Sequence, residues 1–146
     1  MTDNTPLRIL VVEDSALTAE QVCELIRCVS FPVVISDVAT EQEALAAVRA
    51  SAPDAIILDL NLRQGSGFGV LRELASLDAK PAVAILTNFA LPRYRELSAL
   101  MGSDYFLDKA RDFALIPRII NSINDRKRLV SPAQTNNTIE AKAEPT

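Results

Sequence analysis

The amino-acid sequence predicts an α/β protein in which five parallel strands alternate with five helices. Two observations lead to this fold class. Short, almost continuous apolar runs recur along the chain, as expected of strands buried on both faces of a sheet. Each run precedes a stretch with apolar residues at helical spacing, which is typical of strand–helix–strand units. The chain has 146 residues, a length that suits one domain.

The strands are assigned to the apolar runs. The first run, Ile-Leu-Val-Val, is the clearest of them, and the third ends at Asp59. The second is short because Ser36 and Asp37 follow it at once. The predicted strands are residues 9–12, 33–35, 55–58, 82–86 and 105–107.

Capping residues mark where the helices begin. Ser15 can cap the first helix, and Thr40 with Glu43 matches the capping-box pattern before the second. Pro92 suits the first position of the fourth helix. Pro117 is tolerated only in the first turn of the last helix, because a later proline would break a helical hydrogen bond.

Composition narrows the classes of function. Hydrophobic residues make up 49% and charged residues 23%, which is typical of a globular protein. The net charge of −4 argues against nucleic-acid binding through bulk positive charge, so we expect no nucleic-acid partner. The sequence has no histidine, which excludes a Ser-His-Asp triad, a Cys-His pair and histidine-ligated zinc in this chain.

No targeting or membrane segment is evident. No apolar run approaches the ~20 residues of a membrane span, and the first residues lack the pattern of a signal peptide. We therefore expect a cytoplasmic protein. Cys23 and Cys28 lie in a helical pattern, and we expect both to be small buried hydrophobic residues.

The composition changes near the C-terminus. The last sixteen residues have no aromatic residue and one isolated isoleucine, too little apolar surface to offset the entropy of ordering them. We expect an N-terminal extension at 1–6, one folded domain at 7–130 and, at 131–146, a disordered tail or a truncated linker.

Polar residues follow four of the predicted strands. Glu13 and Asp14 follow the first strand, Asp59 the third and Thr87 the fourth, while Lys109 lies just beyond the fifth. The carboxyl ends of parallel strands meet at one edge of an open sheet, where ligands bind. Each residue alone is ordinary, as a cap, a core residue or a surface lysine, but their joint placement predicts a site.

The residue types at this edge suit phosphoryl transfer. Clustered carboxylates favour a hard divalent cation such as Mg²⁺. A carboxylate can also attack phosphorus and form an aspartyl phosphate. The charge on the transferred group then needs a metal, an ammonium group and a hydroxyl or amide donor. Asp59, Mg²⁺, Lys109 and Thr87 together meet these needs, and Gly65 and Gly67 permit tight turns in the loop after Asp59.

From Leu7 to Arg128 the sequence resembles the response-regulator receiver domains of bacterial two-component signalling. The motifs that carry the resemblance are Glu13-Asp14 after Ile-Leu-Val-Val, Asp59 after Ile-Ile-Leu, Gly67 eight residues further, Ile85-Leu86-Thr87, and Tyr105-Phe106-Leu107-Asp108-Lys109. The resemblance implies a flavodoxin-like, doubly wound (βα)5 fold with strand order 2-1-3-4-5. The sequence shows no output domain after residue 130, so we expect either a stand-alone receiver that acts through a partner or one piece of a longer protein cut in a linker.

The resemblance assigns a role to each site residue. Asp59 would accept a phosphoryl group from a sensor histidine kinase or a phosphotransfer protein. Asp14 would bind Mg²⁺ directly and Glu13 through water, while Asp59 and the main-chain carbonyl of Asn61 would complete the protein ligands. Lys109 would pair with the phosphoryl group.

The resemblance also implies a switch. Thr87 would move toward the phosphoryl group, and Phe106 would fill the space that Thr87 leaves. The face built from the fourth helix, fifth strand and fifth helix would then change, and a downstream protein or a second copy of the chain would bind there. Such a protein catalyses only its own phosphorylation and dephosphorylation.

Four positions depart from the usual family pattern. Arg63 stands where proline is common, and Asn88 replaces a small residue. Phe89 is bulky where many members are polar. Ala110 stands in place of a proline that is often cis, so we expect a trans peptide bond there.

Two other functions fit parts of the pattern. A phosphohydrolase of the haloacid-dehalogenase class also uses an Asp nucleophile and Mg²⁺, but it places the nucleophile after its first strand and a second Asp two residues further on. Here that position is Asn61, so the general acid–base carboxylate is missing. An unphosphorylated docking module is the third hypothesis, and the complete site argues against it.

Overall fold

The computed structural model describes residues 5–129 and contains one five-stranded parallel sheet in the order β2-β1-β3-β4-β5. This confirms the predicted order 2-1-3-4-5. The predicted tail at 131–146 lies outside the described residues, as do residues 1–4 of the predicted extension. The strands are β1 (Leu7–Val12), β2 (Val33–Val38), β3 (Ala55–Leu58), β4 (Ala82–Thr87) and β5 (Tyr105–Asp108).

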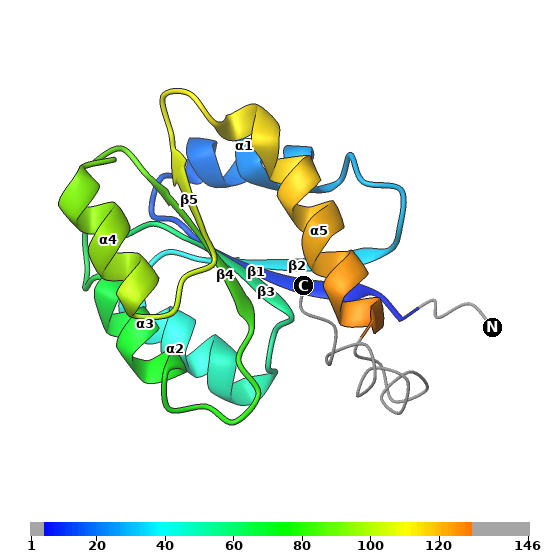
Figure 1. Cartoon of the computed structure of the whole chain (residues 1–146), viewed down its shortest axis with the longest axis horizontal. Helices are drawn as coiled ribbons and strands as arrows, with labels where there is room; N and C mark the ends of the chain where they lie inside the picture. The colour runs from blue at the N-terminus through cyan, green and yellow to red at the C-terminus, as the bar shows by residue number, and fades with distance from the viewer. Residues whose placement is uncertain (1–4, 130–146) are drawn as a thin grey trace, which may run out of the picture.

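Helices cover both faces of the sheet. In Figure 1, α1 and α5 lie on one side of the strands, whereas α2, α3 and α4 lie on the other. This doubly wound arrangement is the one that the sequence predicts. The helices are α1 (Ala16–Ile26), α2 (Glu41–Ala50), α3 (Gly67–Leu74), α4 (Pro92–Leu100) and α5 (Ile116–Leu129), and a short 3-10 helix at Phe113–Leu115 precedes α5.

The hydrophobic core has two halves, one on each face of the sheet. Successive residues of β1 point to opposite faces, so Ile9 and Val11 pack toward α1 and α5 while Leu10 and Val12 pack toward α2 and α3. Each fully buried aliphatic side chain of this kind contributes about 1.5–3 kcal/mol to folding. The central strands are therefore held from both sides, and their carboxyl ends form a rigid platform.

The predicted helix starts are confirmed. The Ser15 hydroxyl accepts a hydrogen bond from the Thr18 amide, and the Thr40 hydroxyl accepts one from the Glu43 amide. The reciprocal bond of the capping box differs from expectation, since the Glu43 carboxylate accepts from the amide of Ala39 rather than from that of Thr40.

Both prolines that bear on helix placement fall where the sequence places them. Pro92 is the first residue of α4, and the helix that contains Pro117 begins one residue before it, at Ile116. Proline is tolerated in a first turn because the amides there have no partner within the helix. Among the described helices, none is long and apolar enough to cross a membrane.

Two predictions need correction. The second strand continues through Ser36 and Asp37 to Val38, because β2 lies at the edge of the sheet, where exposed polar residues such as these two are tolerated. Cys23 is buried as expected, but Cys28 is exposed. Cys28 lies in the turn after α1, which ends at Ile26, so the helical periodicity that buries Cys23 does not extend to it.

Candidate functional site

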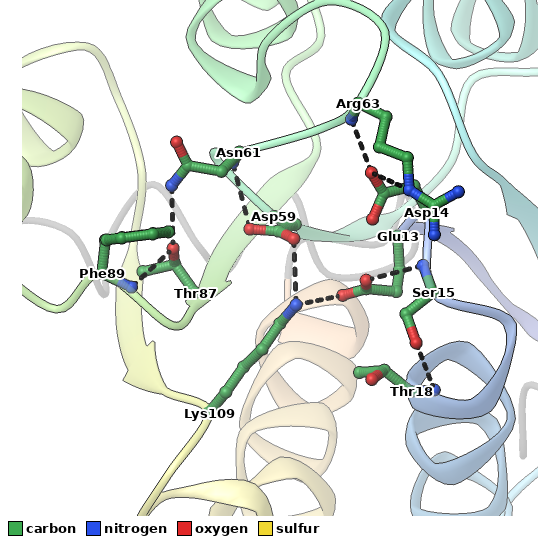
Figure 2. Close-up of polar contacts among 10 residues, drawn as sticks. All are labelled: Glu13, Asp14, Ser15, Thr18, Asp59, Asn61, Arg63, Thr87, Phe89 and Lys109. Carbon is green, nitrogen blue, oxygen red and sulfur yellow. Dashed lines mark hydrogen bonds and ion pairs between the residues drawn. The ribbon is translucent and has the colours of Figure 1, made fainter.

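The carboxyl ends of β1, β3, β4 and β5 meet at one edge of the sheet and carry the predicted site residues. Figure 2 shows the acids, the lysine and the threonine converging there from these strands. A cleft of about 230 Å³ opens at this edge. It is lined by Glu13, Asp14, Ser15, Thr18, Asp59, Asn61, Asn88, Phe89 and Lys109.

Three carboxylates form the centre of the site. Glu13, Asp14 and Asp59 each offer an oxygen, and these oxygens lie within 4.8 Å of one another. Glu13 and Asp59 are buried, with 5% and 4% of their surface exposed, whereas Asp14 is partly exposed. Like charges held this closely repel one another, so the cluster requires cations.

Lys109 is the cation that reaches the two buried acids. Its Nζ lies 2.7 Å from Oε1 of Glu13 and 2.9 Å from Oδ2 of Asp59. The main-chain amide of Lys109 donates to the carbonyl of Thr87 at 2.9 Å, which holds the residue just past the end of β5. The lysine therefore ties the ends of β1, β3 and β5 together through one ammonium group.

Burial and charge shift two pKa values in this cluster. Burial raises the pKa of Glu13, and its bonds with Lys109 and Ser15 only partly offset that effect. Burial acts in the opposite sense on Lys109, but hydrogen bonds and charge from Glu13 and Asp59 outweigh it and raise the pKa of the ammonium group. Lys109 therefore stays charged at neutral pH.

The acid cluster also has the capacity to bind a divalent cation. Oε1 of Glu13 is fully buried and, among the described residues, accepts no hydrogen bond of ordinary geometry, so its only strong contact is the ion pair with Lys109. The other oxygen, Oε2, accepts from the Ser15 amide at 3.0 Å. Three hard carboxylates with spare acceptor capacity fit Mg²⁺.

The loop after β3 presents Asp59. Oδ1 of Asp59 accepts from the main-chain amide of Asn61 at 3.1 Å, while the Asp59 amide donates to the carbonyl of Val12 at 3.0 Å. Gly65 has φ +92°, a value that favours glycine. At Gly67, a Cβ atom would lie only 2.3 Å from the carbonyl oxygen of Asp59. Glycine at these two positions therefore lets the loop fold back against the acid.

Thr87 lies beneath the cleft rather than on its wall. It is fully buried, and its hydroxyl accepts from the Phe89 amide at 3.2 Å and from the Asn61 side-chain amide at 3.5 Å. Figure 2 shows the hydroxyl between these two residues, with Lys109 reaching Asp59 from another direction. No hydrogen bond between Thr87 and Asp59 is present among the described residues.

Phe106 lies farther from the acids. It faces the half of the core that packs against α2 and α3, together with Tyr94 and Met101. The guanidinium carbon of Arg95 lies 4.6 Å from the centre of the Phe106 ring, a cation–π arrangement. The peptide bond before Ala110 is trans, as expected.

Three contacts were not predicted. Arg63 binds Asp14, the Asn61 side chain binds Thr87, and Arg95 covers Phe106. Some indication of the Arg63 contact was present in the sequence, since Arg63 departs from the family pattern four residues after Asp59. The other two had none, because they depend on how α4 and the loop after β3 pack.

Residues 9–121 match the family model of the response regulator receiver domain, and the chain belongs to this family. Its fold, with the acid cluster at the carboxyl edge of the sheet, is the one that the family shares. Receiver domains interact with histidine kinases or phosphotransfer proteins and with downstream targets. By fold and family, this chain is a phosphorylation-switched signalling receiver.

Individual relatives agree with this assignment. The chain is 29% identical over 131 residues to the uncharacterized transcriptional regulatory protein YvfU of Bacillus subtilis, a match that covers 90% of this chain and 66% of that protein. The phosphorylated cyanobacterial phytochrome response regulator RcpA is 25% identical, with a TM-score of 0.71 over 83% of this chain and 93% of the other. A CheY-like receiver domain from Methylobacillus flagellatus is 28% identical, with a TM-score of 0.68 over 82% and 99% of the two chains. The chain spans about two thirds or less of the length of the first curated relatives that it matches.

Proposed function

We propose that Asp59 is the residue that accepts the phosphoryl group. The observation that carries this proposal is the set of contacts around its carboxylate, in which Lys109 holds one oxygen and the Asn61 amide the other. These contacts orient the carboxylate in a cleft shared with two further acids. Because it is the acid held by both the lysine and the loop amide, Asp59 is the best placed nucleophile.

The reaction that we propose is the transfer of a phosphoryl group from a histidine nitrogen of the donor protein to a carboxylate oxygen of Asp59. An oxygen of Asp59 forms a bond to phosphorus, and the bond from phosphorus to the nitrogen of a donor histidine breaks, leaving its electron pair on that nitrogen. The Lys109 ammonium neutralises negative charge on the phosphoryl oxygens. The Asn61 amide keeps the nucleophile oriented as the bond forms.

The acids supply the metal site in this proposal. Asp14, Asp59 and the Asn61 carbonyl would hold Mg²⁺ directly, and Glu13 would hold it through water. When bound, the ion neutralises charge on the phosphoryl oxygens. The solved relative RcpA is described as phosphorylated, which supports the use of this fold as a phosphoryl carrier.

The switch that we propose runs through Thr87 and Phe106. To reach a phosphoryl group on Asp59, the Thr87 hydroxyl must leave the Phe89 amide and the Asn61 side chain, both of which it contacts. Phe106 then turns toward the vacated space and away from Arg95. This changes the face formed by α4, β5 and α5, which would bind a downstream protein or a second copy of the chain.

Among residues 5–129, no contact at the site favours a phosphohydrolase. The residue two positions past Asp59 is Asn61, whose amide cannot act as a general acid or base, and its side chain donates to Thr87. We therefore propose that the chain is regulatory, and that its chemistry is limited to gaining and losing its own phosphoryl group.

Mass spectrometry of the intact protein tests the assignment of Asp59. After incubation with acetyl phosphate and Mg²⁺, we expect the wild type to gain one phosphoryl group and Asp59→Asn to gain none. Asp78→Asn is the matched control, since Asp78 is exposed and lies outside the cleft. Full labelling of a folded Asp59→Asn variant would overturn the assignment.

A further inference from the structure

Arg63 contacts one acid of the cluster in two ways. Its main-chain amide donates to Oδ2 of Asp14 at 2.5 Å, and its Nε lies 3.9 Å from the same oxygen. Figure 2 shows the arginine folded back over Asp14 from the loop after β3. The arginine side chain is 80% exposed and that of Asp14 16% exposed. The amide contact is therefore the shorter one, while the guanidinium adds a charge that solvent reaches.

Asp14 differs from the other two acids in its partner. Lys109 pairs with Glu13 and with Asp59, but the ion pair of Asp14 is with Arg63. Three carboxylates thus share two cationic side chains. Of the two acids that the proposed metal site uses as direct ligands, Asp14 is the one whose oxygen is engaged by Arg63, whereas Asp59 is engaged by Lys109.

We propose that Arg63 competes with the divalent cation for Asp14 and so sets the Mg²⁺ affinity of the receiver. This inference rests on the proposed metal site. Binding of the cation through Oδ2 requires that oxygen to give up its contacts with Arg63. The guanidinium also adds a positive charge next to a site for a doubly charged ion, and this repulsion weakens binding further.

The two contacts of Arg63 make separate contributions. Any residue except proline keeps the main-chain amide, so replacing arginine by alanine removes only the guanidinium. The guanidinium is exposed, and ionic strength screens exposed charges. The part of the competition that comes from the side chain must therefore shrink as salt is added, whereas the part that comes from the amide must persist.

Isothermal titration of MgCl₂ into the metal-stripped full chain measures this competition. At low ionic strength we expect Arg63→Ala to bind Mg²⁺ roughly three- to tenfold more tightly than the wild type. Arg63→Lys keeps the charge and should remain near the wild type. Arg49→Ala is the matched control, because this exposed arginine pairs with Glu73 at 3.1 Å and lies outside the cleft. Its affinity for Mg²⁺ should equal that of the wild type.

Titrations at higher ionic strength and with the variant Arg63→Pro provide the second part of the test. The difference in Mg²⁺ affinity between the wild type and Arg63→Ala should become smaller in about 0.5 M KCl, where the Debye length falls to roughly 4 Å. Arg63→Pro also removes the amide, so we expect it to bind Mg²⁺ more tightly than Arg63→Ala if it folds. The comparison of Arg63→Ala with Arg63→Lys tests the role of the guanidinium independently of the proline variant.

Equal or weaker Mg²⁺ binding by Arg63→Ala would overturn the role of Arg63 and leave the metal site intact. Failure of the metal site itself has a different signature. In that case Asp14→Ala would give the same Mg²⁺ titration as the wild type, because no part of the binding heat would depend on Asp14.

Discussion

Lys109 is the residue on which the electrostatics of the site depend. Its ammonium group lies within 3 Å of two buried carboxylates that would otherwise repel each other. Removing one partner of a buried charge pair leaves an uncompensated charge, which is why such groups are costly to change. Burial raises the pKa of the Glu13 carboxyl and Lys109 lowers it, and because burial has the larger effect the pKa remains raised.

The raised pKa of Glu13 makes stability depend on pH. Burial favours the protonated carboxyl in the folded state, so the folded protein binds a proton more tightly than the unfolded chain, whose value is near 4.5. The contribution of Glu13 to stability is therefore largest below pH 4.5 and falls as pH rises through the raised folded-state value. We expect Glu13→Gln to become more stable relative to the wild type as pH increases from about 4.5 to 7.

Urea unfolding in EDTA, at several pH values across this range, measures the difference. The chelator is needed because a bound cation would stabilise the ionised acid of the wild type. Glu20→Gln is a suitable control, since Glu20 is an exposed residue of α1 and lies outside the cleft. A difference between Glu13→Gln and the wild type that does not vary with pH would contradict this account.

At the scale of elements, the loop between β3 and α3 is held from two sides. On one side, Asp14 accepts from the Arg63 amide. On the other, the amide of Glu41 at the start of α2 donates to the carbonyl of Gln64 at 3.1 Å, and Oε1 of Glu41 accepts from the Ser66 amide at 2.9 Å. The loop that carries the Asn61 amide is thus fastened to Asp14, just after β1, and to α2, so its backbone can hold Asp59 in one orientation.

Gly67 tests the importance of this close packing. A methyl group at this position would lie 2.3 Å from the main-chain oxygen of Asp59, and backbone yields less easily than the end of a side chain. We expect Gly67→Ala to lower the free energy of unfolding by about 1–3 kcal/mol, the usual scale of overpacking, and to slow phosphorylation by acetyl phosphate.

Gly102→Ala separates the two effects of the Gly67 variant. Gly102 has φ +107°, so alanine there is strained, but nothing lies within 4 Å of the added methyl group. We expect a loss of about 1–2 kcal/mol in stability with an unchanged labelling rate. If Gly67→Ala behaved in the same way, the close contact with Asp59 would have no bearing on the site.

At the scale of the whole molecule, three contacts lie along the route that the proposed switch would take from the cleft to the face formed by α4 and β5. The Thr87 hydroxyl accepts from the Phe89 amide, and β4 pairs with β5 so that Ile85 lies beside Phe106. Arg95 of α4 covers the Phe106 ring. In the proposed switch, a movement of Thr87 would reach α4 through Phe106 and Arg95, which together would form a small two-state element of the kind that allosteric switches need.

This linkage predicts a response at α4 and β5 when the site is loaded. We expect beryllofluoride with Mg²⁺ to change amide hydrogen exchange in peptides of α4 and β5, and to shift binding of a partner or a second copy by about 5- to 150-fold. Thr87→Ala should lose both effects. Peptides from β2, at the opposite edge of the sheet, are the internal reference. A full response in Thr87→Ala would mean that the signal leaves the cleft by another route.

The sequence by itself determined the fold class, the strand order implied by the resemblance, and the acids, threonine and lysine that meet at one edge. These follow from local periodicity and from the rule that the carboxyl ends of parallel strands share an edge. The course of β2 through Ser36 and Asp37 was missed because an edge position tolerates residues that a central strand would not.

Only the tertiary structure decided which groups pair at the site. The sequence places Lys109 near the acids but does not say that it bridges Glu13 and Asp59 while Arg63 binds Asp14. It does not show that the Thr87 hydroxyl contacts Asn61 and Phe89. Such pairings depend on distances of a few ångströms between loops, and those distances are set by how the helices pack on the sheet rather than by any local pattern of residues.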